Sequence, residues 1–169
     1  MGGAARPTGT VTVAELCQRH RRIGLDTNVL VYVLEDVTPY AAIGQAIVNA
    51  IEARHVSAVL ASIGLAELAT GPVQSGDAAL VERYVDEFRS VSGLVIAPLS
   101  AEIAVDAAIM RDSRRIGLAD AIHLAIARAS GATAFVTNDR QIRGSPRLEI
   151  IYLDDLELAA VHPFDVNAS

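Results

Sequence analysis

The chain has 169 residues, enough for one domain, and 51% of them are hydrophobic, so it can bury a sizeable core. Its net charge of −6 argues against a protein that coats nucleic acid non-specifically, but not against clustered carboxylates offset by divalent cations. Lysine is absent, which excludes catalytic schemes that need one, and the single cysteine, Cys17, excludes an intrachain disulfide or a thiolate metal cluster. No apolar run has transmembrane length and no signal peptide is recognisable, so we expect a soluble cytoplasmic protein without membrane association.

Residues 1–21 are expected to form a flexible N-terminal extension, because its first residues are small, polar and rich in Gly and Pro. Within this extension, Thr12 and Glu15 have the spacing of a capping box, which predicts a short helix. The domain itself is expected over residues 22–160, and residues 161–169 are expected to form a C-terminal tail.

Strands and helices alternate through the domain. Short buried strands are predicted at residues 23–25, 56–60, 94–96, 134–136 and 148–153. Apolar periodicity predicts helices at residues 29–34, 40–54, 62–71, 80–88, 100–110 and 119–130, with Ser62 as the cap of the third and Gly71-Pro72 as its end. Strands separated by helices of this length imply parallel pairing with right-handed crossovers. The predicted fold class is therefore α/β, a three-layer sandwich with a parallel sheet of about five strands and helices on both faces.

Four acidic residues lie where such a sheet carries its chemistry. Asp26 and Asp139 each follow a predicted strand closely, and ligands of open α/β sheets bind beyond the carboxyl ends of strands. Asp120 lies just inside a helix start, and Glu67 lies on the helix after the second strand, both among apolar neighbours. Acids that meet at a sheet edge need a cation, and an all-oxygen ligand set favours Mg²⁺ or Mn²⁺.

Each acid also has a purely structural interpretation. Asp26 and Asp139 can stabilise turns through their own backbone, Asp120 suits a helix dipole, and Glu67 can be a solvated surface residue. These interpretations are less convincing jointly, because a carboxylate that faces an apolar core is costly without a partner.

The motifs around these acids resemble those of the PIN-domain ribonucleases, and most closely the toxin half of VapBC toxin–antitoxin pairs. They are Leu-Asp-Thr-Asn at 25–28, Ala-Glu-Leu at 66–68, Leu-Ala-Asp-Ala-Ile-His-Leu-Ala at 118–125 and Val-Thr-Asn-Asp at 136–139. The resemblance covers about residues 22–155 and implies the PIN-like sandwich described above. The N-terminal extension departs from the family, whose toxins usually begin just before the first strand.

The resemblance also implies a function. The chain would be a metal-dependent endoribonuclease that cleaves RNA with a metal-activated water, leaving a 5′-phosphate and a 3′-hydroxyl, and that inhibits translation as a toxin. Mg²⁺ or Mn²⁺ would be the cofactor, and the partners would be a cognate antitoxin and a second copy of the chain, in a homodimer or a toxin–antitoxin hetero-oligomer. The implied catalytic and metal-binding residues are Asp26, Glu67, Asp120 and Asp139, with Thr27, Asn28 and Thr137 in support.

Two further features have weaker interpretations. His123 lies three residues after Asp120 and so shares a helix face with it, but a lone histidine on an apolar helix is more often packed or part of a polar network than a metal ligand. Half of the arginines fall in residues 111–147, and Arg114 and Arg115 are the first candidates for contacts to RNA phosphates. The alternative for these arginines is a salt-bridged surface.

Two rival enzyme classes are excluded by the residues present. A phosphohydrolase of the haloacid dehalogenase type needs a second Asp where this chain has Asn28, and it also needs a lysine, as does a response-regulator receiver domain. One alternative stays open: a catalytically silent PIN-like module that only binds RNA or a partner. A metal-dependent cleavage assay distinguishes that module from a nuclease.

Overall fold

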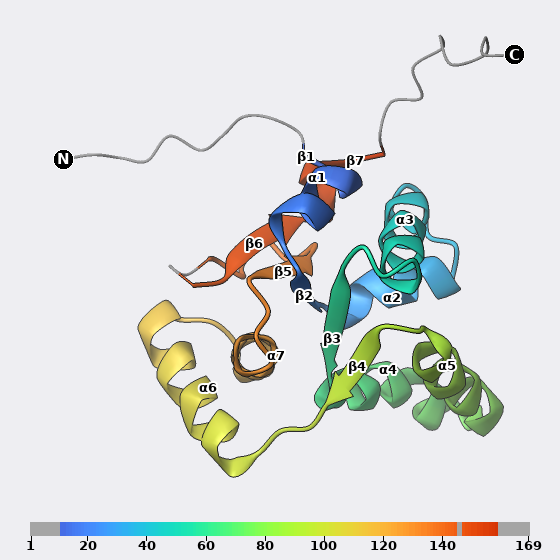
Figure 1. Cartoon of the computed structure of the whole chain (residues 1–169). Helices are drawn as coiled ribbons and strands as arrows, with labels where there is room; N and C mark the ends of the chain where they lie inside the picture. The colour runs from blue at the N-terminus through green and yellow to red at the C-terminus, as the bar shows by residue number, and fades with distance from the viewer. Residues whose placement is uncertain (1–10, 145–146, 159–169) are drawn as a thin grey trace, which may run out of the picture.

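A five-stranded parallel sheet forms the centre of the molecule (Figure 1). The computed structural model describes residues 11–144 and 147–158. The strands are β2 (Arg22–Leu25), β3 (Ser57–Ala61), β4 (Leu94–Ala97), β5 (Ala134–Thr137) and β6 (Glu149–Tyr152). Their order is β4-β3-β2-β5-β6, and every neighbouring pair is parallel. The predicted fold class and the five predicted strands are confirmed.

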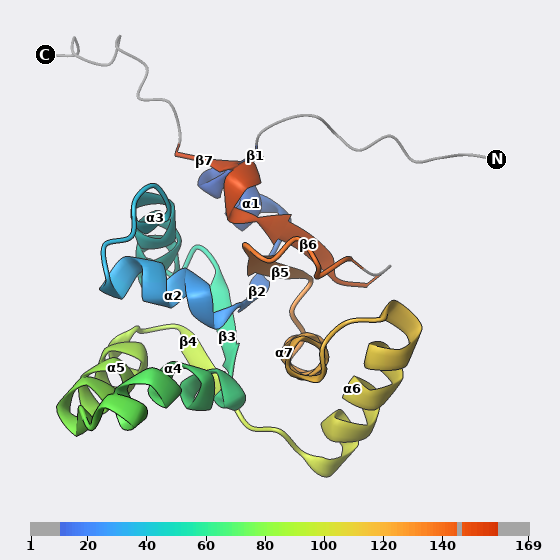
Figure 2. The same cartoon turned by 180° about the vertical axis from the view of Figure 1, so that it is seen from behind.

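Helices cover both faces of this sheet, because each strand is apolar on both sides. They are α2 (Thr27–Leu34), α3 (Tyr40–Glu52), α4 (Ser62–Ser75), α5 (Ala78–Ser90), α6 (Ala101–Arg114) and α7 (Leu118–Ala129). Side chains alternate along a strand, so Ala58 and Leu60 of β3 join one core cluster, and Val59 and Ala61 join the other. Figures 1 and 2 show α2 and α3 on one side of the sheet and α6 and α7 on the other, which gives the three layers.

Gly24 allows α7 to pack directly on β2. A Cβ at this position would lie 2.6 Å from the Cβ of Ala127 and 2.6 Å from Cδ2 of Phe135. Since a crossover helix runs antiparallel to the strands it connects, this contact leaves the first turn of α7, with Asp120, at the carboxyl edge of the sheet.

The N-terminal extension is folded onto the domain from residue 11 onward. Strand β1 (Val11–Thr12) pairs in parallel with β7 (Leu156–Glu157), which follows the short 3-10 helix Leu153–Asp155. Helix α1 (Val13–Arg19) begins with the predicted capping box and buries Leu16 completely. The extension predicted to be flexible is therefore partly ordered, because Leu16 contributes to the core. Its residues 1–10, like the predicted tail at 161–169, lie outside the described residues.

Helix α4 differs from its prediction at both ends. Its N-cap is Ala61 rather than Ser62, and it runs through Pro72 to Ser75 before Gly76 ends it in the left-handed conformation, with φ 74°. Proline crowds the Cβ of the residue before it, and Gly71 has none, so the helix can include Pro72 at the loss of one backbone donor. The extra turn lengthens the wall that α4 contributes to the site.

No helix within residues 11–144 and 147–158 is both long and apolar enough to cross a bilayer.

Candidate active site

The strand order reverses between β2 and β5, and this reversal marks the site. From β2 the chain builds outward through β3 and β4, then returns to the other side of β2 for β5 and β6. Asp26 follows β2 directly, and its backbone N–H donates to the Val136 carbonyl of β5 at 2.9 Å. Asp139 lies two residues beyond the end of β5. The connections that follow these two parallel strands run to opposite sides of the sheet and leave a crevice between them. Ligands of such sheets bind in this crevice, at the carboxyl ends of the strands.

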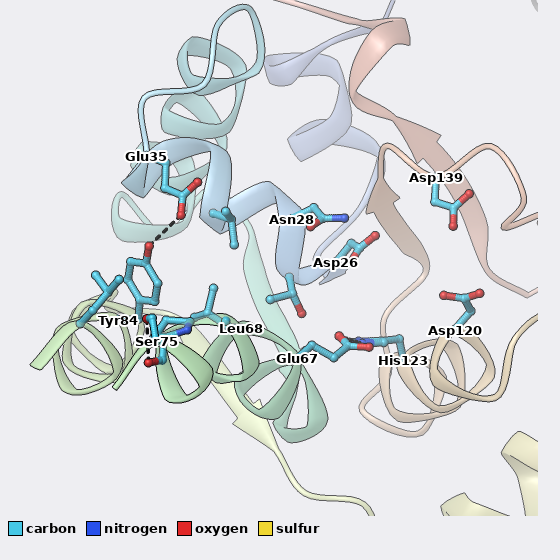
Figure 3. Close-up of a pocket in the computed structure, with 15 residues that line it drawn as sticks. Asp26, Asn28, Glu35, Glu67, Leu68, Ser75, Tyr84, Asp120, His123 and Asp139 are labelled. Atoms are coloured by element: carbon cyan, nitrogen blue, oxygen red, sulfur yellow. Dashed lines mark hydrogen bonds and ion pairs between the residues drawn. The ribbon is translucent and has the colours of Figure 1, made fainter. Parts of the chain in front are cut away.

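The four predicted acids line one cleft of about 670 Å³ at this crevice. Asp26, Asp120 and Asp139 direct their carboxylates toward a common space, whereas Glu67 lies beside His123 (Figure 3). These acids come from the end of β2, the start of α7, the loop after β5 and the middle of α4. The fold thus brings together residues up to 113 positions apart, since Asp26 and Asp139 line the same cleft.

Thr137 connects two of the acids. Its fully buried hydroxyl donates to Oδ2 of Asp26 at 2.6 Å and accepts the backbone N–H of Asp139 at 3.0 Å. Asp26 occupies the N-cap position of α2, yet its side chain makes no capping hydrogen bond there. Its side-chain partner is thus Thr137 and not the backbone of its own turn, which disfavours the interpretation of Asp26 as a turn stabiliser. Asp139 does have a turn contact, because its Oδ1 accepts the backbone N–H of Gln141 at 2.8 Å.

The pKa of Asp120 reflects the negative charge gathered in the cleft. Burial raises the pKa of its carboxyl above the ordinary value, and the negative charges of Asp139 and Asp26 raise it further. His123 and the Gly117 backbone oppose these effects. The crowded carboxylates thus repel one another in the absence of a cation, and the space they share attracts positive charge.

Glu67 does not face the core, contrary to the sequence-based expectation. Its side chain is 44% exposed in the cleft, and its Oε2 pairs with Nε2 of the buried His123 at 2.9 Å. The hydrogen bond from His123 lowers the pKa of the Glu67 carboxyl, although partial burial acts in the opposite direction. Of its apolar neighbours in sequence, Leu68 is packed partly against the core but Ala66 is exposed, so the apolar flanks gave a misleading signal of burial.

His123 takes part in a polar contact with Glu67. This agrees with the sequence-based interpretation that a lone histidine on an apolar helix is packed or part of a polar network. It reaches Glu67 because Gly64 lets α4 approach α2 and α7 closely. A Cβ on Gly64 would overlap the hydroxyl of Thr27 and lie 3.4 Å from Cε1 of His123. Thr27 is itself buried, and its hydroxyl makes no hydrogen bond of good geometry with any described residue, although it lies near enough to lower the pKa of Glu67 slightly.

The four acids offer the type of ligand that Mg²⁺ and Mn²⁺ prefer, because all of their donor atoms are carboxylate oxygens. Within the described ranges, however, no three His, Cys, Asp or Glu side chains converge closely enough to enclose an ion. Mg²⁺ keeps several of its waters and is held by as few as one or two carboxylates. The acids could therefore hold a largely hydrated ion, and the negative charges of Asp139 and Asp26 beside Asp120 would favour its binding.

Arg114 and Arg115 are not brought to this cleft. Arg114 is half-buried and donates to the Arg143 carbonyl at 3.3 Å. Arg115 ends α6 in the left-handed conformation, with φ 55°, and lines a separate surface hollow with Leu118. Their proposed contact with RNA would need a substrate that extends well beyond the acids.

The far end of the cleft contains two residues that the sequence did not single out. Tyr84 of α5 donates its hydroxyl to Oε1 of Glu35, at the end of α2, at 2.7 Å. Figure 3 shows this pair at the end of the cleft away from Asp120. Tyr84 belongs to the apolar stripe of α5, and no local pattern marks its hydroxyl as part of the cleft.

The structure is thus a parallel α/β sandwich with a cluster of acids in a cleft at its switch point, and comparison with known proteins identifies its family. The family model of the PIN domain matches residues 23–147. The chain therefore belongs to the PIN domain family, whose members are generally metal-dependent nucleases. None of the curated proteins matches the chain.

Two solved structures share the fold. One is VapBC2 from Rickettsia felis bound to a DNA fragment from its promoter, with 24% identity over 78% of this chain and 98% of that chain, at a TM-score of 0.59. The other is a toxin–antitoxin complex from Klebsiella pneumoniae, with 20% identity over 75% of this chain and 94% of that chain, at a TM-score of 0.54.

Proposed function

We propose that this protein is an endoribonuclease that uses Mg²⁺ or Mn²⁺ and acts as the toxin of a toxin–antitoxin pair, inhibiting translation in the cytoplasm. Membership in the PIN domain family supports the nuclease, and the two toxin–antitoxin complexes with the same fold suggest the biological setting. The observation that carries the proposal is the convergence of Asp26, Asp120 and Asp139, from three separate elements, on one space at the switch point.

The residues of the cleft have distinct parts in this proposal. Asp26, Glu67, Asp120 and Asp139 would hold the metal, which would neutralise the anionic phosphodiester and lower the pKa of a bound water. Thr137 fixes the orientation of Asp26 through its hydroxyl, and Thr27 and Asn28 form the wall beside that carboxylate. Without a cation the four carboxylates would repel the RNA backbone, so substrate binding and chemistry both require the ion.

A cleavage assay with the purified chain tests this function. Single-stranded or loop RNA should be cut in Mg²⁺ or Mn²⁺, and excess EDTA should stop the reaction. Asp26→Asn and Asp139→Asn should be inactive, whereas Asp86→Asn, which changes an exposed acid on α5 that does not line the cleft, should cut like wild type. RNA cleavage that persists in EDTA would exclude the metal mechanism.

The alternative is the catalytically silent PIN-like module, which only binds RNA or a partner. The observation in its favour is that, among the described residues, no three acidic or histidine side chains lie close enough together to enclose an ion. RNA binding without cleavage in either metal would support this alternative.

The antitoxin is expected to cover the same cleft. The acidic end of the cleft is complementary to a basic side chain of the antitoxin. The other end is lined by Val31, Leu68 and Leu80 and is complementary to apolar side chains of the antitoxin. We expect a small protein encoded beside this gene to co-purify with the chain and block cleavage. Leu80→Asp should prevent co-purification without stopping cleavage, and recovery of only free chain from the native operon would contradict the toxin assignment.

Self-association through α6 is the expected route to a homodimer. Val105 and Ile109 are 63% and 62% exposed on this helix, beside the exposed Ala104 and Ala108. In an antiparallel pairing of two α6 helices about a twofold axis between residues 106 and 107, Val105 lies opposite Ala108 and Ile109 opposite Ala104. The same axis places Glu102 opposite Arg111 of the other copy, so size and charge are both self-complementary.

A further inference from the structure

A hydrogen bond joins the half-exposed side chain of Glu67 to the buried ring of His123. Glu67 has a long side chain that is 44% exposed, and a free glutamate in this position would sample many rotamers. His123 is only 4% exposed, and its ring lies 6.5 Å from that of Phe135 in the core. The contact between them is 2.9 Å, which fits a full hydrogen bond.

The surroundings of His123 define which ring nitrogen carries the proton. A carboxylate only accepts hydrogen bonds, so Nε2 of His123 must be the donor to Glu67. The other nitrogen, Nδ1, is buried and has no hydrogen-bond partner among the described residues. The hydrogen-bond geometry therefore places a proton on Nε2, the nitrogen that faces the Glu67 carboxylate.

The backbone is shaped to make this contact. Gly64 precedes Glu67 by one helical turn and thus lies on the same face of α4, and it is the residue that lets this face approach His123 and Thr27. His123 in turn follows Asp120 by three residues on α7. The residue that holds the Glu67 carboxylate therefore lies within one helical turn of Asp120, whose pKa is raised by the neighbouring acids.

We propose that His123 is a positioning residue, whose Nε2–H holds Oε2 of Glu67 and leaves Oε1 directed into the cleft as a preoriented oxygen donor for the cation. This inference rests on the proposed metal-dependent function. It assigns His123 a role through Glu67 and not as a metal ligand, since its only nitrogen that reaches the cleft is already engaged. Hydrogen-bond partners of metal ligands typically account for 10- to 100-fold in metal affinity.

Mn²⁺ titration of the purified full chain by calorimetry provides the main test. His123→Leu, which keeps an apolar side chain in the core but no donor, should weaken Mn²⁺ binding about 10- to 100-fold. His123→Gln, whose terminal amide can donate from near the position of Nε2, should retain binding within about threefold of wild type. Glu67→Gln should weaken binding as well, and adding His123→Leu to it should cause little further loss, because the two residues act as one unit.

The outcomes separate this inference from the function on which it rests. Wild-type affinity in His123→Leu, or an undiminished effect of His123→Leu in the Glu67→Gln background, would overturn the positioning role while leaving the metal site intact. A wild-type chain that binds no Mn²⁺ would instead overturn the metal-dependent function, and the inference with it. Glu52→Gln, an exposed acid at the end of α3, is the matched control and should bind like wild type.

A spectroscopic measurement covers the case in which His123→Leu does not fold. In ¹⁵N-histidine-labelled wild type, the His123 signals, assigned by their loss in His123→Gln, should show a proton on Nε2. Glu67→Ala should remove this preference and give signals averaged between the two positions of the proton. A wild-type ring that carries its proton on Nδ1 would contradict the proposal, because Nε2 would then face the carboxylate as an acceptor.

Discussion

Thr137 shows how a single buried hydroxyl organises the acidic site. It donates to Asp26 and accepts from the backbone of Asp139, so it couples the ends of β2 and β5. Thr137→Val has nearly the same shape but leaves the Asp139 N–H without its acceptor. We expect a loss of about 1–3 kcal/mol in the free energy of unfolding and a lower cleavage rate.

Thr137→Ser is the control for this substitution, because it keeps the hydroxyl and loses only a methyl group. It should retain more activity than Thr137→Val. Urea denaturation in EDTA, together with the rate of RNA cleavage in Mn²⁺, measures both effects. Equal activity in the Val and Ser variants would show that the hydroxyl does not organise the acids.

Asp120 provides a prediction about pH. Burial and the charges of Asp139 and Asp26 raise its pKa in the folded state, so its ionised form opposes folding. Because folding raises the pKa of this carboxyl group, the folded protein is relatively more stable at a pH below 3.8, the pKa of the group in the unfolded chain. This stability is lost as the pH rises through the folded-state pKa. In EDTA, Asp120→Asn should therefore unfold at the same or higher temperature than wild type at neutral pH, and the advantage should shrink as pH falls toward 3.8.

Thermal unfolding across this pH range, with Asp86→Asn as the exposed control, measures the difference. The same variant should gain less stability from Mn²⁺ than wild type, which should gain about 2.7 kcal/mol at a hundredfold excess over the dissociation constant. An Asp120→Asn protein that is clearly less stable at neutral pH in EDTA would identify this residue as a helix-start stabiliser instead.

The positions of three acids could be predicted from sequence because each is tied to an element end. Asp26 and Asp139 follow buried strands, and Asp120 begins a helix, so their place at the sheet edge follows from the parallel topology. The direction of Glu67 could not be predicted, since it depends on how closely α4 approaches α7. That distance is determined by Gly64 against Thr27, a contact between distant segments that leaves no local pattern.

At the scale of the helix, Gly64 is expected to control the placement of α4. Replacing a helical glycine with alanine normally stabilises a protein by about 0.5–1 kcal/mol. Gly64→Ala should destabilise it instead, by about 1–3 kcal/mol, because the added Cβ overlaps the Thr27 hydroxyl. Chemical denaturation measures the sign of the change.

A second substitution tests the cause. Thr27→Ala removes the overlapping oxygen, so Gly64→Ala should cost less, or become stabilising, when Thr27 is already alanine. A destabilisation of the same size in both backgrounds would show that another contact limits the approach of α4.

The ends of helices could be predicted where local side-chain hydrogen bonds to the backbone determine them. Thr12 with Glu15 and the Ser100 cap of α6 both appear as expected, because their hydrogen bonds are local. The end of α4 was predicted wrongly, because Gly71-Pro72 is ordinarily a helix stop. The helix continues to Ser75, and its last turn helps to line the far end of the cleft.

For the whole molecule, alternation of strands and helices was enough to predict the parallel sandwich, since βαβ connections have one handedness. The parallel pair β1 and β7 was not predicted. Each of these strands has two residues, and their pairing joins the start of the described chain to its last strand. Strands this short carry no periodicity, so only the tertiary fold reveals them.

Helix α6 has one face packed on α7 and another face exposed, where a second copy of the chain could pack. If two copies pair through that exposed face, Ile109→Asp should convert a dimer into a monomer, as measured by light scattering after size-exclusion chromatography. The fold should be unaffected, since Ile109 is 62% exposed. Val73→Asp is the matched control on α4, 65% exposed, and should stay dimeric.

A charge exchange tests the antiparallel register. Glu102→Arg should weaken the dimer, because it places an arginine opposite Arg111 of the other copy. The double variant Glu102→Arg/Arg111→Glu reverses every such pair and should restore dimerisation to near the wild-type level. A double variant that dimerises no better than Glu102→Arg would exclude this register. A wild-type chain that stays monomeric at all concentrations would exclude the α6 interface altogether.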